Sequence, residues 1–242
     1  MSAATPPAPS GSPFRNRDFA KLWTAATISL FGTQVSQIAI PVIAVLVLKV
    51  PPFQVAVLGT LEFLPFLLFT LPAGVWVDRL PRRLVLVSGD LGRAAMLATI
   101  PIAYLLGALT IWQLYVIAFV NGTLTVFFDI ADQSYLPTVL DRDQLVEGNA
   151  RLQASVSTAQ VVGQPVGGSV VGLFGAPFAV VLDAISYVAS AVLIFAIRRR
   201  ERASRPGAAA AAVVAEEVAD SGPAGASVAA ELAAARGEAR DD

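Results

Sequence analysis

Side chains that could bind a proton or a polar molecule interrupt several long apolar stretches of the sequence. Glu62 and Asp183 each place a carboxylate inside such a stretch, where an ionisable group is costly and is therefore a functional candidate. Glu62 could bind a proton or a cationic substrate, whereas Asp183 could do the same or could cap or pair structurally. Gln34 and Gln37 lie one turn apart, and their amides predict either a polar cavity or a hydrogen bond between helices.

Two further pairs of charged residues are spaced to share one face of a helix. Asp90 and Arg93 are three residues apart, so they can neutralise each other, and we favour a structural role for this pair. Asp129 and Asp132 have the same spacing near the end of another stretch. We expect these two carboxylates to reach the arginines of a nearby basic loop and to form a conformational latch.

The sequence contains no cysteine and no histidine. Disulfides, thiolate nucleophiles and the usual zinc sites are therefore excluded, as are hydrolytic triads and dyads that need histidine. No nucleophile–base pair and no metal-binding cluster stands out, so we expect neither an enzyme nor a bound cofactor or metal. No basic face interleaved with aromatic residues points to a nucleic-acid partner.

The stretches that carry these residues are long enough to cross a lipid bilayer as helices. Hydrophobic residues make up 55% of the 242 residues and charged residues only 14%, against about 25% in a typical soluble domain. Apolar stretches of about 20 residues recur along the chain. They cover residues 22–48, 55–77, 84–106, 111–130, 152–174 and 178–197. We therefore predict an all-α membrane protein with a bundle of six transmembrane helices.

The connections between these stretches alternate in charge. Arginines gather before the first stretch, around residues 79–83, around 142–151 and after residue 197, whereas the other connections hold only Lys49. The positive-inside rule then places both ends of the chain in the cytoplasm, which requires an even number of spans. The connection at 133–150 is the longest and could carry a short surface helix.

The two ends of the chain differ in composition from the part between them. Residues 1–13 are rich in Pro, Ser and Ala and lack the apolar core of a signal peptide, so we expect a disordered leader. Residues 14–200 form the predicted bundle. Residues 201–242 contain almost no large apolar residues, and we expect a disordered cytoplasmic tail or a truncated interdomain linker.

The most specific motif lies between the second and third stretches. It reads GVWVDRLPRR and resembles the Gly-x-x-x-Asp-Arg-x-x-Arg-Arg loop of the major facilitator superfamily, although Leu-Pro stands where that family usually has a second glycine. The resemblance implies a cytoplasmic latch loop composed of Gly74, Asp78, Arg79, Arg82 and Arg83. In this loop the glycine would allow close helix contact, and the aspartate would cap or neutralise the start of the next helix. The arginines would bind lipid phosphates or neighbouring carboxylates, such as the two of the fourth stretch. The alternative is a basic loop that only sets the topology.

Other segments resemble the same family. They are NRDF at 16–19, FD at 128–129, LP at 136–137 and LDAISY at 182–187, and together they resemble the branch of enterobactin-exporter-like and macrolide-efflux-like proteins. The fifth stretch reads GQPVGG and is similar to the Gly-Pro-x-x-Gly-Gly motif of the exporters, with the proline displaced by one position. Gly163, Pro165, Gly167 and Gly168 could serve such a motif or simply let two helices pack closely.

The resemblance covers residues 14–200 and implies one six-helix half of a twelve-helix transporter. Its implied activity is export of a hydrophobic or amphiphilic small molecule, driven by protons through alternating access, across a bacterial plasma membrane. Because 242 residues make only one half, we expect a truncated or split product, a partner half encoded separately, or a homodimer. The alternative is a membrane scaffold or accessory subunit that transports nothing.

Overall fold

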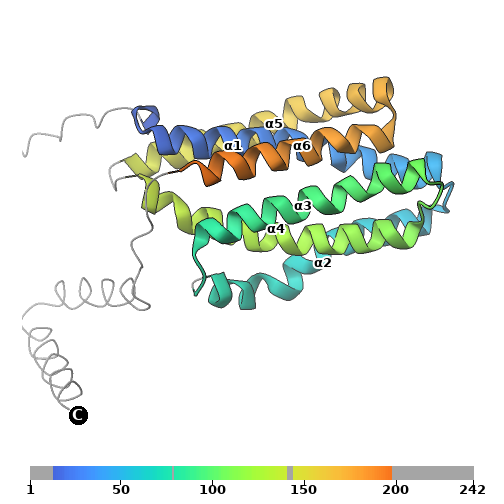
Figure 1. Ribbon diagram of the computed structural model, residues 1–242, viewed down its shortest axis with the longest axis horizontal. Coiled ribbons are helices and arrows are strands. Elements are labelled where there is room, and N and C mark those ends of the chain that lie inside the picture. The colour runs from blue at the N-terminus through green and yellow to red at the C-terminus, as the bar shows by residue number, and fades with distance from the viewer. Residues whose placement is uncertain (1–12, 78, 141–143, 198–242) are drawn as a thin grey trace, which may run out of the picture. The chain divides into compact units, whose positions relative to one another are not determined.

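The computed structural model describes residues 13–77, 79–140 and 144–197. Residues 1–12 of the predicted leader, the predicted tail and Asp78 of the latch loop lie outside these described residues. Six long helices make up the described chain (Figure 1). They are α1 (Arg17–Val42), α2 (Pro52–Val77), α3 (Arg82–Leu105), α4 (Ile111–Val139), α5 (Leu145–Phe174) and α6 (Ala176–Phe195). A 3-10 turn (η1, Pro13–Arg15) precedes α1, and a π-helical turn (η2, Ile43–Val47) extends it.

The composition of these helices agrees with an all-α membrane bundle. Among the described residues, the helices that are long and apolar enough to cross a membrane are α1 with its π-helical extension, α2, α3, α4 and α6. The 30-residue helix α5 is long enough but less apolar, because Gly, Ser and Gln recur along it. The prediction of six long helices is confirmed, and that of a sixth membrane crossing in α5 stays a prediction.

The helices pack as an open arc rather than a closed ring. Following the neighbour contacts, the order is α2, α4, α3, α6, α1 and α5, so that α2 and α5 form the two edges. Figure 1 shows the two groups that result, with α1, α5 and α6 together and α2, α3 and α4 together. The helices alternate in direction. We call the end at which α1 begins and α6 finishes the basic end, and the end at which α2 and α4 begin the loop end.

Two helix boundaries differ from the sequence prediction. Helix α1 begins at Arg17 rather than near residue 22, because the Asn16 side chain caps it by accepting a hydrogen bond of 3.0 Å from the Asp18 backbone N–H. Helix α4 continues through Pro137 to Val139, so the expectation of a long 133–150 connection with its own surface helix was wrong. The last turn of α4 is apolar and buried, and that burial favours helix over loop.

Two apolar clusters lie on either side of a buried polar layer. One gathers side chains towards the loop end, such as Ile43, Leu97 and Leu114. The other lies towards the basic end and includes Phe19 and Leu86. Buried charged and hydroxyl groups from α1, α3 and α6 are interspersed between the clusters. The bundle is therefore apolar at both depths and polar in between, which is where a candidate site is expected.

Candidate functional site

A cavity of about 240 Å³ opens among α1, α2 and α4 in the half of the bundle that faces the loop end. One side chain of α3 and two of α6 complete its wall. The wall is mixed in character, with aromatic and aliphatic side chains beside a small number of polar groups. The polar groups are Thr33, Ser36 and Gln37 of α1, Glu62 of α2, Asn121 and Thr125 of α4, and Asp183 and Tyr187 of α6. Few polar groups in a mostly apolar cavity is the usual composition of a small-molecule site.

Asp183 is held at the back of this cavity by α1 and α6. Its side chain is 1% exposed, and its Oδ1 accepts a hydrogen bond of 3.1 Å from the Ser186 hydroxyl. The hydroxyl of Ser36 on α1 also faces this carboxylate. Gly32 makes the arrangement possible, because a Cβ at that position would lie 2.6 Å from Oδ1 and would overlap Ser186. Asp183 is therefore both a structural contact between α1 and α6 and a cavity group, the two roles that the sequence left open.

Glu62 occupies the opposite wall. It is an exposed residue of α2 and makes no hydrogen bond within the described part of the chain. Next to it, Gly122 of α4 allows α2 to come close, because a Cβ there would overlap the Glu62 carbonyl oxygen and lie 3.0 Å from Cγ of Pro65. The Glu62 carboxylate is thus presented to the cavity and remains available to a ligand or a proton.

The two glutamines of α1 lie in different environments. Gln37 is exposed and lines the cavity, as predicted. Gln34 is buried and lies against Gly163 of α5, so the prediction of a second cavity amide there was wrong. The reason is rotation: residues three apart on a helix differ by about 60° in direction, enough to place one at the cavity and the other at a helix contact.

Several cavity residues were missed by the sequence reasoning. Asn121 has a buried Oδ1 without a hydrogen-bond partner among the described residues, and it faces the cavity. Tyr187 shares a hydrogen bond of 2.9 Å with Thr33 across α6 and α1. The signal for Asn121 was present, since an amide in the middle of an apolar stretch is unusual. Nothing local marked Thr33 or Tyr187, whose role depends on their meeting.

The pair formed by Asp90 and Arg93 is confirmed as an ion pair. Arg93 Nη2 lies 2.5 Å from Asp90 Oδ1, and both side chains are at most 5% exposed. The guanidinium carbon is 4.2 Å from the centroid of the Phe128 ring and 4.3 Å from that of Tyr187. Arg93 is therefore sandwiched between α4 and α6, with aromatic faces as well as a carboxylate stabilising its buried charge.

Among the described residues, the expected ion pairs between α4 and the arginines of the basic loop do not occur. Asp129 and Asp132 lie on the side of α4 that faces α3, near Arg93. Arg82 instead donates a hydrogen bond of 3.1 Å to the Ser134 carbonyl oxygen. Arg83 donates to the Phe195 carbonyl oxygen and lies over the Phe195 ring at 4.9 Å. The arginines thus contact the basic ends of α4 and α6 through backbone carbonyls.

The other described residues of the loop are Arg79 and Gly74. Arg79 is exposed, and its predicted part in the loop stays a prediction. Gly74 was expected to allow a close helix contact, but a Cβ there would meet nothing within 4 Å among the described residues. Ala73 and Val77 beside it are buried, so Gly74 lies on a face of α2 that points away from the described neighbours of this helix end.

The glycines of α5 divide into two sets. Gly163 and Gly167 are buried against α1, where a Cβ on Gly163 would lie 2.6 Å from Gln34 Cγ and one on Gly167 would lie 3.2 Å from Val35 Cα. Gly168 and Pro165 are exposed, and a Cβ on Gly168 would meet nothing within 4 Å. Half of the predicted motif is therefore a helix-packing contact within the bundle.

No group of three or more histidine, cysteine or acidic residues able to hold a metal ion occurs among the described residues. The chemistry that the cavity can perform is reversible binding: apolar contact from its walls, hydrogen bonding from amides and hydroxyls, and charge from two carboxylates on opposite sides.

Comparison with known proteins supports a membrane transporter. The family model described as "Transmembrane secretion effector" matches residues 8–221. The chain is 27% identical over 196 residues to the uncharacterized MFS-type transporter YkuC of Bacillus subtilis, covering 81% of this chain and 45% of that protein. It is 24% identical over 181 residues to macrolide efflux protein A of Streptococcus pyogenes, covering 74% of this chain and 44% of that one.

The chain spans less than half the length of these curated relatives. No solved structure matches the chain.

Proposed function

The chain belongs to the transmembrane secretion effector family of the major facilitator superfamily, on its macrolide-efflux-like branch, and we propose that it forms one cavity-bearing half of an exporter. The exported molecule is a hydrophobic or amphiphilic small molecule. Transport proceeds by alternating access, in which two six-helix halves rock around a cavity near the middle of the membrane. We place the protein in a bacterial plasma membrane with both termini in the cytoplasm, as the distribution of arginines predicts.

The observation that carries this proposal is the mixed lining of the cavity. Aromatic side chains such as Phe63 and Phe66 offer apolar contact area, while Gln37 and Asn121 offer amides that orient a bound molecule. The cavity is bounded by α1, α2 and α4, and the arc leaves it uncovered on the side between the two edge helices. A second half facing this side would complete the chamber.

Proton coupling rests on the two carboxylates of the cavity. Glu62 lies on the open wall and Asp183 on the closed one, so a proton and a substrate can compete for the first while the second senses the contact between α1 and α6. A carboxylate that must become charged inside a membrane protein changes the free energy of its surroundings enough to bias two conformations. Neither Asp90 nor Arg93 suits this role, because each already neutralises the other.

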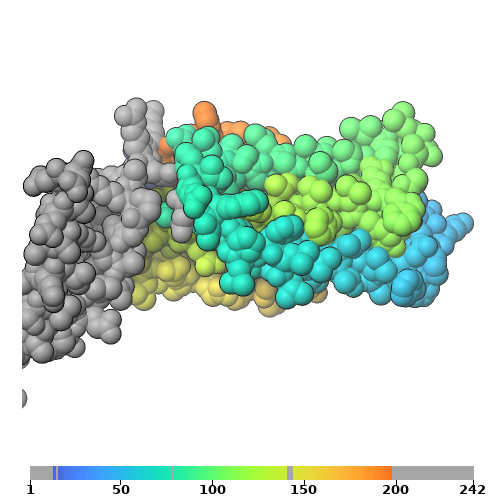
Figure 2. All heavy atoms as spheres, turned by 90° about the horizontal axis from the view of Figure 1, so that it is seen from below, coloured from blue at the N-terminus to red at the C-terminus, as the bar shows by residue number. Residues whose placement is uncertain are grey.

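The partner is a second six-helix half or a second copy of this chain. The edge helix α2, seen beside α4 in Figure 2, exposes many large apolar side chains. The other edge helix, α5, exposes small and polar residues together with large apolar ones such as Val161 and Leu173. Both surfaces flank the uncovered side of the cavity, so one partner could contact both of them.

Transport by the full chain in proteoliposomes tests the proposal. We would measure proton-driven movement of a radiolabelled macrolide and compare Glu62→Gln and Asp183→Asn with Glu147→Gln, an exposed carboxylate of α5 outside the cavity. We expect the two cavity variants to lose transport at unchanged expression and the control to keep it. Transport that survives both cavity substitutions would contradict the proposal. A chain that binds no macrolide and moves none, alone or with a separately expressed second half, would favour a scaffold.

A further inference from the structure

A second and larger hollow, of about 670 Å³, lies between α2 and α4 on the side of their contact that faces away from the cavity. Its α2 wall runs from Phe53 to Leu61 and its α4 wall from Ile111 to Val120. The cavity is lined by other residues of the same two helices, such as Leu58 and Asn121. The two hollows are therefore separated by the α2–α4 contact and share no lining residue.

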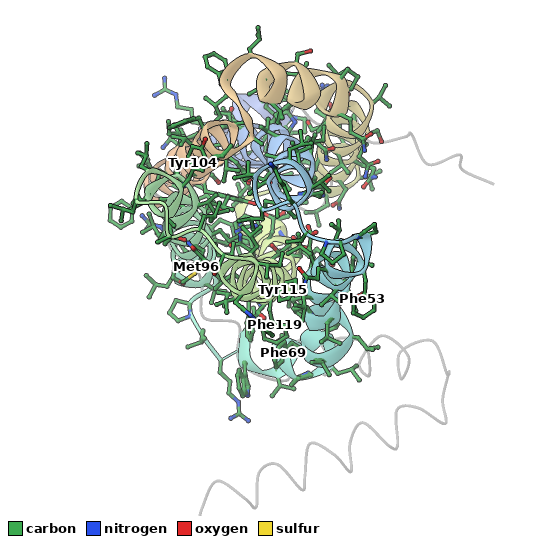
Figure 3. The ribbon with its side chains drawn as sticks, turned by 90° about the vertical axis from the view of Figure 1, so that its right-hand side faces the viewer. Phe53, Phe69, Met96, Tyr104, Tyr115 and Phe119 are labelled. Carbon is green, nitrogen blue, oxygen red and sulfur yellow. The ribbon has the colours of Figure 1, made fainter. Side chains whose placement is uncertain are left out.

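This outer groove is built from aromatic and aliphatic side chains. Figure 3, which looks at the bundle from the loop end, places Phe53, Tyr115 and Phe119 around the crossing of α2 and α4. Trp112 stands at the mouth, packed edge-on against Tyr115 with ring centroids 5.6 Å apart. The Tyr115 hydroxyl is already used, because it donates a hydrogen bond of 3.1 Å to the Gln54 carbonyl oxygen. The groove thus offers mainly apolar surface, with the side-chain amide of Gln54 as a polar group of its lining.

The dimensions of the groove suit one lipid chain. From Phe53 to Leu61 the helix rises by about 12 Å, at about 1.5 Å per residue. One leaflet of a bilayer has a hydrocarbon depth of about 15 Å, half of the usual thickness. Both walls belong to helices that are long and apolar enough to cross a membrane. Tryptophan and tyrosine at the mouth match the aromatic residues that mark the edge of the hydrocarbon layer.

A basic residue lies close in sequence to the groove, four positions before Phe53. Lys49 precedes α2 by three residues, is exposed, and is the only basic residue at the loop end of the described chain. No acidic residue lies between Lys49 and Leu61, so nothing local neutralises the ammonium group. We infer that the groove between α2 and α4 binds one acyl chain of an anionic phospholipid whose phosphate lies near Lys49. The site is distinct from the proposed transport cavity and does not depend on it.

Photo-labelling in a defined bilayer tests the inference. The full chain is placed in phosphatidylcholine nanodiscs that contain a small fraction of phosphatidylglycerol with a diazirine on its acyl chain, and labelled peptides are mapped by mass spectrometry. We expect labelling of residues 53–61 and 111–120 to exceed by several-fold that of other exposed membrane-facing residues such as Leu91. Even labelling of all exposed faces would overturn the site.

Matched variants distinguish specific lipid binding in the groove from non-specific lipid contact with any exposed apolar surface. Val116→Trp fills the groove, and Val192→Trp adds the same bulk at a similarly exposed valine of α6, the two valines being 58% and 61% exposed. We expect only the first to abolish the preferred labelling. Equal effects of the two, or none, would contradict the inference, as would efficient cross-linking of the groove to a second copy of the chain.

The predicted role of Lys49 in selecting an anionic head group is tested by a separate measurement. Lys49→Gln should lower the labelling ratio of phosphatidylglycerol to an equally labelled phosphatidylcholine by about fivefold, which corresponds to about 1 kcal/mol per basic residue at an anionic surface. An unchanged ratio would show that Lys49 does not select the lipid. Displacement of the label by an added macrolide, with transport lost in Val116→Trp, would assign the groove to a transported molecule instead and overturn the lipid site.

Discussion

The two edge helices hold equivalent positions at the ends of the arc but differ in amino-acid composition. Helix α2 is strongly apolar and bears its large side chains outward, with Leu67 and Leu71 83% and 89% exposed. Helix α5 is less apolar and turns glutamines and glycines outward, such as Gln160 and Gly168, beside large apolar side chains such as Val161 and Leu173. The first surface matches lipid or an apolar partner. The second is mixed and matches a partner that offers both polar and apolar contacts.

The way in which each edge helix is attached differs as well. Helix α2 rests on a glycine of its neighbour, because Gly122 of α4 leaves room for the backbone at Glu62. Helix α5 brings its own glycines, Gly163 and Gly167, against α1. Lipid is as apolar as leucine, so apolar surface alone cannot attach a helix in a membrane, and small residues that permit close contact do so instead. Both edge helices are attached through glycines, which belong to the neighbouring helix at α2 and to the edge helix itself at α5.

The largest expected effect is that of Gly122→Ala at the α2 attachment. The new Cβ would overlap a backbone carbonyl, which no side-chain rotation can relieve. Overpacking of this kind costs about 1–3 kcal/mol and outweighs the gain of about 0.5–1 kcal/mol from replacing a helical glycine. We expect a net loss of about 1–2 kcal/mol, measured by thermal unfolding in detergent with tryptophan fluorescence as the probe. Unchanged stability would show that α2 is not seated on Gly122.

Gly163→Ala should have the same sign at the α5 attachment but a smaller size. Its Cβ would lie 2.6 Å from Gln34 Cγ, which can rotate away, and 2.8 Å from Gln34 Cβ, which can yield only if the helix shifts. We expect a loss of about 1 kcal/mol in the same unfolding assay. The double variant Gly163→Ala with Gln34→Ala should recover part of the loss, because it removes Cγ and the amide but leaves Cβ in place. No recovery would mean that the contact is not with Gln34.

Gly168→Ala, on the exposed side of α5, should raise the stability of the chain. A Cβ at this position meets nothing within 4 Å, so only the reduced freedom of the unfolded chain counts, at about 0.5–1 kcal/mol. Gly74→Ala on α2 is the matched test, because its Cβ is equally free. A loss of stability in either variant of the purified chain would reveal a contact at that edge, such as a second copy.

The smallest effect is expected from the exposed ion pair on α5. Arg151 approaches Glu147 Oε1 at 2.8 Å, but both side chains are 44% exposed. Pairs of this kind contribute about 0.3–0.5 kcal/mol, so Glu147→Gln should change stability by no more than that, and less at high salt. Unfolding midpoints at low and high salt measure the difference. A change above about 1 kcal/mol would indicate that this part of α5 is more enclosed than a surface helix.

Local spacing predicted the contacts that lie within one helix. Asp90 and Arg93 were expected to pair because residues three apart share a face, and they do. Contacts between helices were predicted less well. Gly163 and Gly167 were expected to meet another helix and do so, whereas Gly74 was expected to and does not. The glycines have the same local signature, and only the position of their helix in the arc tells them apart.

The predicted pairing of Asp129 and Asp132 with the loop arginines does not occur among the described residues, for a related reason. Asp129 and Asp132 could reach either the loop or α3 according to how far α4 is rotated about its axis, and the structure turns them towards Arg93. The cavity amides show the same dependence, since rotation of α1 places Gln37 in the cavity and Gln34 against α5. Asn121 was missed because its role depends on its position in the cavity wall, which the packing of α4 against α1 and α2 decides.

By itself, the sequence determined that this chain is a set of long apolar helices in a membrane, and its motifs identified the superfamily. Length, hydropathy and i,i+3 spacing are properties of single segments, so they can be read without knowing what lies beside them. Only the tertiary structure decided which face of each helix lines the cavity, which glycines are contacts, and that α2 and α5 are the edges. Those features depend on the rotation of each helix against its neighbours, which is set by side chains far apart in the sequence.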